Sequence, residues 1–558
     1  MCGIFFSLIP KSKSALIARE LDKYTLVRLQ LEETLKRRGP DCFNTVVCDV
    51  KTNDEGGIGQ LTFFSTVLSM RDPLTPQPLQ SQEGRILQFN GELYDVVGQL
   101  EEYRSGLLGG DTSVSKNDTA LLSQLFNRFG VLETLQSVRG EYAFVYYDSL
   151  SKCLWWARDC IGRRSLLVNR CRKDCIALSS LAPTHATFRG NWREVPAGEV
   201  YKLDLHTMGI EVVKWSYEPS GSLVLYSYFL ELTRYPYLPI CHDVSFYQLS
   251  YDTVVGELSS TLLAAVRRRV LAIHHAPSTA DTYAILFSGG IDCTLLAYLT
   301  AICLRDHTAH VDLLNVAFEN PRIGGGYNTP DRILGRQSWQ ELRSLPALQS
   351  SQCDFRFVEI NVPYTQVLEH KSRVQDLMFP KDSVMDFSIA LAFFFAARGL
   401  GTMFASPDAD PAEEYSTTSR VLISGLGADE LFAGYTRHGT SFARGGYETL
   451  ADELTLDFGR LHERNLGRDD RVGADWGKEF RYPYLDEEFV HFALQCPLDS
   501  KMRVRGNGIE GKWLLRQLAR YIGLRHVAEE KKRAIQFGAR SAKMEVGQGK
   551  IKGTAKFV

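Results

Sequence analysis

The stretch Ala284-Ile285-Leu286-Phe287-Ser288-Gly289-Gly290-Ile291-Asp292-Cys293 decides the fold of the second half of this 558-residue chain. Its four leading apolar residues predict a short strand that is buried on both faces, as in a parallel sheet. Between 295 and 302, apolar residues then recur at helical spacing. The pattern therefore predicts a strand, a tight glycine loop and a helix.

A loop of this kind can bind phosphate. Backbone N–H groups in a glycine-rich turn, with the positive end of the following helix, form a cradle for phosphate oxygens. Asp292 either caps the helix or offers a carboxylate to Mg2+, which proteins usually hold through one or two carboxylates and the phosphates. The loop is neither G-x-x-x-x-G-K-[ST] nor G-x-G-x-x-G, so taken alone it also fits an ordinary strand-to-helix turn.

A second motif favours the phosphate site. Residues 422–435 read Leu-Ile-Ser-Gly-Leu-Gly-Ala-Asp-Glu-Leu-Phe-Ala-Gly-Tyr. Together the two motifs resemble the asparagine synthetase family, whose members adenylate a carboxylate with ATP and transfer ammonia to it. The resemblance implies that Asp292 and Asp429 share Mg2+ across the nucleotide, although Asp429 also fits a helix N-cap. It implies ATP contacts from Phe287, Ser288, Gly289, Gly290, Asp292, Cys293, Ala317, Ser424, Gly425 and either Lys532 or Arg533, a basic run that also fits a solvated surface.

The N-terminus carries a candidate nucleophile, Cys2. If Met1 is removed, the α-amine of Cys2, with a pKa near 7.7–8.0, can accept the proton of a thiol that ordinarily titrates near 8.5. The segments Arg38-Gly39-Pro40-Asp41 and Asn90-Gly91-Glu92 resemble those of class II glutamine amidotransferases. In that resemblance Asn90 and Gly91 supply donors to a tetrahedral oxyanion. The alternative for Asn90-Gly91 is a hairpin turn.

Glutamine-binding residues follow from the same resemblance. They are Arg71, Asn90, Gly91, Glu92 and Asp118. Asp118 would hold the α-amine of glutamine, or else it is an N-cap. The family's carboxylate-binding arginine begins an R-L-x-x-x-D segment, whereas 67–72 here read Val-Leu-Ser-Met-Arg-Asp. Arg71 is therefore displaced by four positions, roughly 13 Å along a strand, so either it reaches glutamine differently or glutamine binding is impaired.

Composition narrows the class of protein. The chain has 64 Lys and Arg against 66 Asp and Glu, a net charge of −2, so no global field recruits nucleic acid or an acidic membrane. The most apolar run, 389–397, is too short to span a bilayer and predicts a core helix. Twelve cysteines without a C-x-x-C pair argue against a disulfide framework or a zinc site and for a reducing cytoplasm. We expect glutamine, ATP and aspartate as partners, with a homodimer as a candidate assembly.

The resemblance sets the domain organisation. Residues 2–215 are expected to form an α+β glutamine amidotransferase domain of the Ntn type, with stacked antiparallel sheets. Residues 216–250 form a linker, and 251–540 an α/β adenylating domain with a doubly wound parallel sheet. Residues 541–558 are expected to be a loose tail. Within the second domain, Arg267-Arg268-Arg269 predicts a solvated helix end, and polar residues 407–418 predict a loop.

Two departures from the family concern chemistry and packing. Leu426 stands where asparagine synthetases carry an acid, and losing a positioned acid or base typically costs 10^2 to 10^4 in rate. Ser165 stands where proline is common. With 535–538, these features are closer to a diverged branch than to the housekeeping synthetase. Two hypotheses follow: a glutamine-dependent amidotransferase in which ammonia passes between the domains to an acyl-adenylate, and a pseudo-synthetase that binds ATP or a partner.

Overall fold

The described residues form two compact units. The computed structural model describes residues 2–11, 15–52, 57–71, 73–97, 100, 117–172, 174–214, 251–273, 281–505, 508–544 and 553–556. The first unit holds the described residues up to 214, joined by Gln375–Lys381 and His462–Glu479 from the second half of the chain; the other described residues form the second unit. The predicted linker, 216–250, and Asp72 lie outside the described residues.

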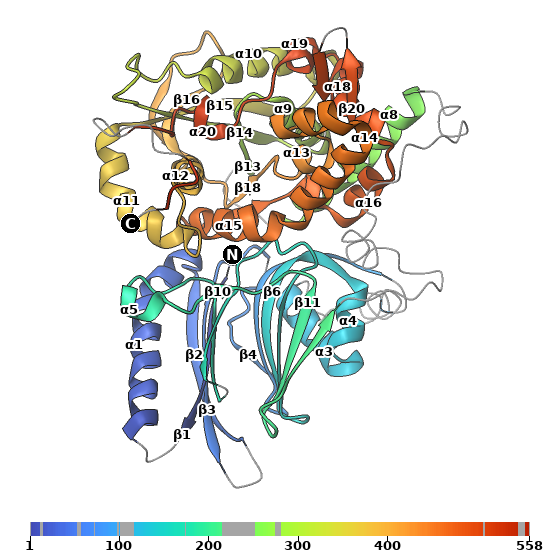
Figure 1. Ribbon diagram of the computed structural model, residues 1–558. Coiled ribbons are helices and arrows are strands. Elements are labelled where there is room, and N and C mark those ends of the chain that lie inside the picture. The colour runs from blue at the N-terminus through green and yellow to red at the C-terminus, as the bar shows by residue number, and fades with distance from the viewer. Residues whose placement is uncertain are drawn as a thin grey trace. The chain divides into compact units, whose positions relative to one another are not determined.

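Two six-stranded sheets stack face to face in the first unit (Figure 1). One has the strand order β10-β8-β9-β1-β3-β2 and the other β12-β11-β7-β6-β5-β4, and every recorded pairing within them is antiparallel. The helices pack on the outer faces, α1 against β1 and β3, and α3 against β5. The expected stacked antiparallel architecture is thereby confirmed. The bounds are β1 Gly3–Lys11, α1 Ala15–Arg38, β2 Cys42–Lys51, β3 Ile58–Val67, β4 Leu79–Gln80, β5 Ile86–Val96, α3 Asp118–Phe129, α4 Val131–Ser137, β6 Val138–Asp148, β7 Cys153–Arg158, β8 Leu167–Arg172, β9 Cys175–Ser179, α5 Ala186–Arg189, β10 Arg193–Glu194, β11 Glu199–Asp204 and β12 Ile210–Lys214.

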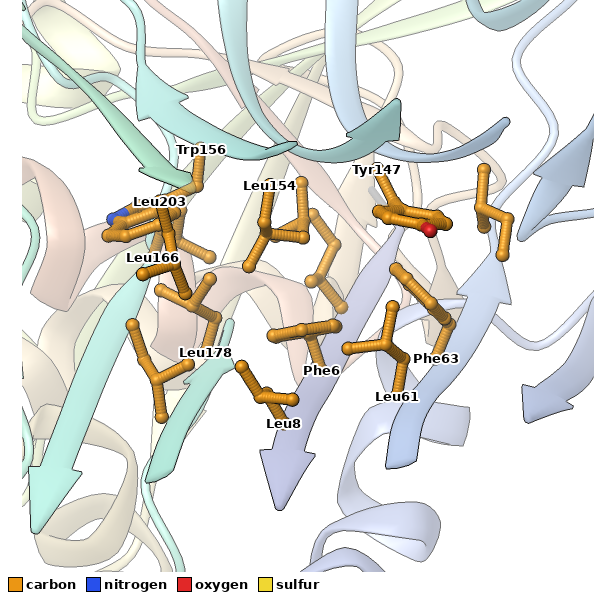
Figure 2. Close-up of a cluster of buried hydrophobic side chains, with 14 of the residues drawn as sticks. Phe6, Leu8, Leu61, Phe63, Tyr147, Leu154, Trp156, Leu166, Leu178 and Leu203 are labelled. Carbon is orange, nitrogen blue, oxygen red and sulfur yellow. The ribbon is translucent and has the colours of Figure 1, made fainter. Parts of the chain in front are cut away.

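The core of this unit lies between the two sheets (Figure 2). Alternate residues of each strand point inward because successive side chains in a strand face opposite sides. Phe6 and Leu8 of β1 and their neighbours on β3 meet Leu154 and Trp156 of β7, all at most 2% exposed. Full burial of each such side chain contributes about 1.5–3 kcal/mol, so this layer fixes the spacing of the sheets on which Cys2 and Asn90 are held.

A seven-stranded sheet with the order β17-β16-β15-β14-β13-β18-β19 forms the centre of the second unit. The strands β15, β14, β13 and β18 run parallel, while β16 and β17 add an antiparallel edge. The predicted doubly wound α/β fold is confirmed. From residue 251 onward the bounds are α8 Tyr251–Val270, β13 Asp281–Leu286, α9 Ile291–Cys303, β14 Ala309–Phe318, α10 Pro330–Ser344, β15 Cys353–Val362, α11 Tyr364–Met378, α12 Val384–Arg398, β16 Leu400–Phe404, β17 Ala412–Ser416, β18 Val421–Ile423, α13 Ala428–Leu431, α14 Thr436–Gly459, α15 Gly467–Ala474, β19 Glu479–Arg481, α16 Glu487–Gln495, α17 Leu498–Lys501, β20 Met502–Arg505, β21 Gly508–Gly511, α18 Trp513–Ile522, α19 Arg525–Glu529 and α20 Ile535–Gly538. Of these elements, α15 belongs to the first unit.

Three local predictions were wrong. The segment 407–418 contains the edge strand β17, which shows no apolar alternation because most of it is exposed to water. Arg269 is fully buried against Asp486 at 2.6 Å, so the basic run at 267–269 is not simply a solvated helix end. The described tail is not loose: Met385 N–H donates to the Gly553 carbonyl at 2.9 Å and Ser541 Oγ to the Ser388 carbonyl at 2.7 Å.

A buried ion-pair network ties His462–Glu479 into the first unit. Arg38 and Asp470 lie 2.8 Å apart with no exposed side-chain surface on either residue. Arg164 stands between Glu141 at 3.2 Å and Glu479 at 3.5 Å, all at most 1% exposed. A buried charge without its partner is strongly unfavourable. The N-terminal segment and this distant stretch therefore depend on each other.

Asp470→Ala tests this dependence, because it leaves the buried Arg38 guanidinium without its carboxylate. We expect a loss of about 3 kcal/mol in the free energy of unfolding of the first unit. The measurement is urea unfolding of the full chain. Asp49→Ala is the matched control, since the Lys11–Asp49 pair is as short, 2.7 Å, but about half exposed, and we expect at most about 1 kcal/mol. Equal losses in the two variants would contradict the role assigned to the network.

The helix α13 buries a carboxyl group, Glu430, that is 2% exposed. Its Oε1 accepts a hydrogen bond from the Tyr435 hydroxyl at 2.6 Å. Burial, followed by the neighbouring Asp429 carboxylate, raises the pKa of Glu430 to about 7. The folded chain therefore binds this proton more tightly than the unfolded chain, so the stability that Glu430 contributes is present at low pH and is lost as the pH rises toward 7.

Glu430→Gln removes this titration and keeps an acceptor for Tyr435. Relative to the unsubstituted protein, the variant should gain stability as the pH rises from about 4.5 to about 7, by about 3 kcal/mol over the whole interval. Urea unfolding at a series of pH values measures the difference. Glu413→Gln, on the exposed strand β17, should leave the pH dependence unchanged. A constant difference between Glu430→Gln and the parent at every pH would refute the argument.

Candidate active sites

Cys2 lies where the two sheets of the first unit meet. It precedes β1, is 8% exposed, and its backbone N–H donates to Asn90 Oδ1 on β5 at 2.8 Å. Burial raises the pKa of the Cys2 thiol, and a hydrogen bond from the Leu68 backbone acts in the opposite direction. The structure thus brings together the predicted nucleophile and the predicted oxyanion residue.

Asn90 and Gly91 are not in a hairpin turn. They lie in the middle of β5 and pair with Ala143 and Tyr142 of β6, so that alternative was wrong. A Cβ at Gly91 would fall 2.1 Å from the Glu141 carbonyl oxygen, which only glycine avoids. Because Asn90 Oδ1 faces the Cys2 N–H, its Nδ2 points elsewhere, and this buried donor has no hydrogen-bond partner among the described residues. Such an unused donor next to a nucleophile suits a developing oxyanion.

Arg71, Glu92 and Asp118 converge despite the displacement of Arg71 in sequence. The Arg71 guanidinium contacts Asp118 Oδ1 at 2.7 Å and Glu92 Oε2 at 2.8 Å. The other Asp118 oxygen accepts from Leu93 N–H at 2.7 Å. Burial, followed by the Glu92 carboxylate, raises the pKa of Asp118 well above its usual range, with Arg71 opposing both. Asn117, not Asp118, caps α3, so the capping alternative for Asp118 was wrong.

The two motifs of the second unit leave adjacent parallel strands at the same edge of the sheet. Ala284 and Ile285 of β13 pair with residues of β18, and ligands bind α/β sheets beyond the carboxyl ends of such strands. A Cβ at Gly425 would lie 3.0 Å from the Asp292 Cβ, so the loops touch. Gly290 and Gly427 occupy the N-cap positions of α9 and α13. The capping alternatives for Asp292 and Asp429 were therefore wrong.

Asp292 and Asp429 meet across a lysine. Lys512 Nζ lies 2.6 Å from Asp292 Oδ2 and 2.6 Å from Asp429 Oδ1, and Lys532 Nζ bonds to the second Asp429 oxygen. Burial opposes ionisation of Asp429, but Lys512 and then Lys532 outweigh it and lower the pKa of Asp429. For Lys532, Asp429 and Asp292 outweigh burial and raise the pKa. Two carboxylates already share a cation here, and that is the donor set that Mg2+ prefers.

The other predicted nucleotide contacts differ in how close they lie to this ion cluster. Arg533 pairs with Glu530 at 3.7 Å, whereas Lys532 pairs with Asp429, so of the two basic candidates Lys532 is the one at the aspartates. Cys293 Sγ donates to the Gly290 carbonyl at 3.2 Å and lies 3.7 Å from Ser288 Oγ, within the loop. Ala317 is fully buried in β14, and Phe287 donates its N–H to Leu314 of that strand at 2.9 Å.

The two glycines of the first loop, Gly289 and Gly290, differ in how much room the structure leaves for a side chain. Gly289 has a φ of +81°, and a Cβ on it would lie 2.5 Å from the Gly335 nitrogen of α10. Ser338 Oγ of the same helix donates to the Gly289 carbonyl at 2.7 Å. Gly289 therefore permits close packing against α10, whereas a Cβ at Gly290 would meet only Ser288 Oγ, at 3.5 Å.

Sequence reasoning missed two residues. Lys512 stands in a left-handed conformation, with φ +57°, at the start of α18, and only its place in Gly511-Lys512-Trp513 signalled it. Gln77 contacts the Cys2 sulfur from a segment that carries no recognisable signal. Leu426 donates its N–H to Ser424 Oγ at 3.3 Å, and its own side chain offers no polar atom in place of the acid.

Comparisons with known proteins agree with this geometry. Residues 1–195 match the family model described as a glutamine amidotransferase domain, and residues 257–450 and 442–550 match that of asparagine synthase. An asparagine synthetase domain-containing protein of Saccharomyces cerevisiae is 35% identical, over 87% of this chain and 84% of that protein. Asparagine synthetase domain-containing protein 1 of Homo sapiens is 32% identical, over 92% and 91%. The glutamine-hydrolysing asparagine synthetase of Gallus gallus is 24% identical, over 87% and 76%.

None of the helices in the described ranges is both long enough and apolar enough to cross a membrane.

Identity with the domain-containing proteins extends over most of both chains, and it agrees with the diverged branch that Leu426 indicated. The two family models together cover Cys2 and its neighbours in the first unit and the Asp292–Asp429 cluster in the second. The chain therefore belongs to the asparagine synthetase family and joins a glutamine amidotransferase domain to an asparagine synthase domain.

Proposed function

We propose that the chain is a glutamine-dependent amidotransferase that uses ATP to amidate aspartate or a related carboxylate. The observation that carries this proposal is the convergence of Asp292, Asp429, Lys512 and Lys532 beyond the carboxyl ends of two parallel strands. Residues 2–215 and 251–540 would be the two functional domains, acting in the cytoplasm, with a homodimer as the assembly to test.

In the first domain Cys2, as the terminal residue, attacks the side-chain amide of glutamine. The α-amine takes the thiol proton and returns it to the amide nitrogen, so that ammonia leaves and a thioester remains, while Asn90 Nδ2 and Gly91 N–H donate to the oxyanion. Water then cleaves the thioester to glutamate and the free thiol. Asp118 and Glu92 provide negative charge for the glutamine α-ammonium, and Arg71 provides positive charge for its carboxylate. Support comes from the unused Asn90 Nδ2 beside Cys2 and from the mutual contacts of the three charged residues.

In the second domain the acceptor carboxylate attacks the α-phosphorus of ATP, forming an acyl-adenylate and releasing pyrophosphate. Asp292 and Asp429 would hold Mg2+, which neutralises phosphate charge when bound. Lys512 and Lys532 would then contact the pyrophosphate oxygens, and the N–H groups of 288–290 and 424–425 would surround it. Ammonia from the first domain displaces AMP and leaves the amide.

Leu426 supports a second candidate, a pseudo-synthetase that binds ATP or a partner without forming amide. One assay separates the two candidates. Pure protein is mixed with ATP, Mg2+, aspartate and glutamine, and the release of pyrophosphate and of glutamate is measured. Cys2→Ala should abolish glutamate release while ammonium chloride still supports pyrophosphate release. Background levels of both products in the parent would overturn the proposed amidotransferase activity. Recovery of pyrophosphate release in Leu426→Glu would show that the loss of activity arises at position 426.

Lys532 and Arg533 are adjacent cations of which one faces the aspartates, so they form a matched pair. Lys532→Met should lower pyrophosphate release by about 100-fold or more, because it removes a positive charge at the developing phosphate charge. Arg533→Met, 45% exposed at its side chain, should stay within about two-fold of the parent. Initial rates at saturating ATP measure both. Similar losses in the two variants would mean that the contact with Asp429 is not the functional one.

Arg71 is tested against Arg85, which pairs with Asp148 at 3.3 Å and is equally buried. Arg71→Met should raise the KM for glutamine by about 10- to 100-fold, since it removes a charge-assisted hydrogen bond to the substrate carboxylate. Arg85→Met should leave it unchanged. Glutamate release at varied glutamine concentration gives the KM of each variant. An unchanged KM in Arg71→Met would show that the displaced arginine does not bind glutamine.

A further inference from the structure

Gln77 is a fully enclosed side chain, 2% exposed, between β3 and β4. Its Oε1 accepts a hydrogen bond from Phe89 N–H at 2.7 Å. An amide oxygen accepts and cannot donate, so this bond fixes the orientation of the amide and directs Nε2 the other way. Nε2 lies 3.7 Å from Cys2 Sγ and 3.2 Å from Thr119 Oγ1, and both of these atoms accept.

This one side chain contacts the Cys2 sulfur and the sequence neighbours of both the oxyanion residue Asn90 and the charged residue Asp118. Phe89 precedes Asn90, whose Oδ1 accepts from the Cys2 N–H at 2.8 Å. Thr119 follows Asp118, which pairs with Arg71. The third contact is the sulfur itself. A shift of Gln77 would therefore move the thiol relative to both the oxyanion residue and the charged residues.

We propose that Gln77 is a positioning residue that holds the Cys2 sulfur in line with Asn90 and stabilises it as the thiolate by donating an amide N–H. The proposal rests on the role of Cys2 in the proposed function. A hydrogen bond to the charged form of an acid favours that form. The donor acts in the same direction as the positive N-terminus and the Leu68 backbone, and against the burial of the thiol and the Glu479 and Glu92 carboxylates, which disfavour a negative charge.

The test uses two substitutions at position 77 in the full chain. Gln77→Glu keeps the acceptor for Phe89 N–H and replaces the donor at sulfur with a carboxylate oxygen. Gln77→Leu removes both bonds. The rate of iodoacetamide alkylation of Cys2 is followed against pH by mass spectrometry of the peptide that contains it. We expect the pH midpoint to rise by about one to two units in both variants.

Gln88 supplies the matched control. It is a fully buried glutamine on β5 whose Nε2 donates to the Phe5 and Phe64 carbonyls at 3.1 and 2.8 Å, with no recorded bond to Cys2. Gln88→Leu should lower Tm at least as much as Gln77→Leu and leave the alkylation midpoint unchanged. A midpoint that does not move in either Gln77 variant, or that moves equally in Gln88→Leu, would overturn the proposal.

Alkylation needs no turnover, so its outcome is independent of the proposed function. A raised midpoint in a protein that releases no glutamate would support the positioning role and count against the amidotransferase. Glutamate release that is lost in the Gln77 variants without a shift in the midpoint would leave the amidotransferase standing and refute the contact with sulfur. Restoration of the parental midpoint by Gln77→Asn would likewise refute it, because the shorter side chain withdraws the donor from the sulfur.

Discussion

The ammonium group of Lys512 between Asp292 and Asp429 is the interaction on which the second unit's site depends. Two carboxylates at such proximity repel, and the repulsion grows as water is removed. Lys512, 2% exposed, neutralises one charge and Lys532 the other. The site is thus electrically balanced within the chain. A ligand carrying both phosphate and a divalent cation brings its own balanced charges, so it can replace these pairs without leaving any of them unpartnered.

That arrangement requires backbone to approach side chains closely. A Cβ at Gly434 would lie 2.0 Å from Asp429 Oδ1 and 2.3 Å from Lys512 Cε, and one at Gly511 would lie 2.2 Å from the Ala433 carbonyl oxygen. Lys512 itself adopts a left-handed backbone, which a lysine rarely does. The glycines and the strained lysine together fix the ammonium group at the aspartates. In the motif Leu-Phe-Ala-Gly-Tyr, Gly434 and the Ala433 carbonyl thus help to set the geometry of the charged groups.

Local patterns in the sequence predicted the strand, glycine loop and helix at 284–302, because buried strands, helical repeats and glycine turns are local features. The stacked sheets of the first unit were expected only from the family resemblance. The sequence predicted the convergence of Asp292 with Asp429 only through the resemblance, since nothing local relates residues 137 positions apart. It could not find Lys512 or Gln77, whose importance arises from which atoms lie opposite them in the fold. Two of the errors came from reading too much into polarity. The segment of β17 is polar and exposed, as expected, but an edge strand can be both, so polarity did not imply a loop. Arg269 is polar but buried, because a buried carboxylate such as Asp486 makes a buried arginine stable.

Ser165 and Leu426, two of the departures from the family pattern, have different structural consequences. At position 165, where proline is common, the Ser165 N–H donates to Asp470 Oδ2 at 3.1 Å and its hydroxyl lies 2.8 Å from Arg471 Nη1. Proline has no N–H to offer, so serine here adds two polar links between the N-terminal segment and His462–Glu479. At position 426 the leucine replaces an acid and its side chain makes no polar contact in return. The first departure adds polar links within the first unit, while the second removes a chemical group from the motif that carries Asp429. The question of activity therefore concerns the groups around that motif and not the fold.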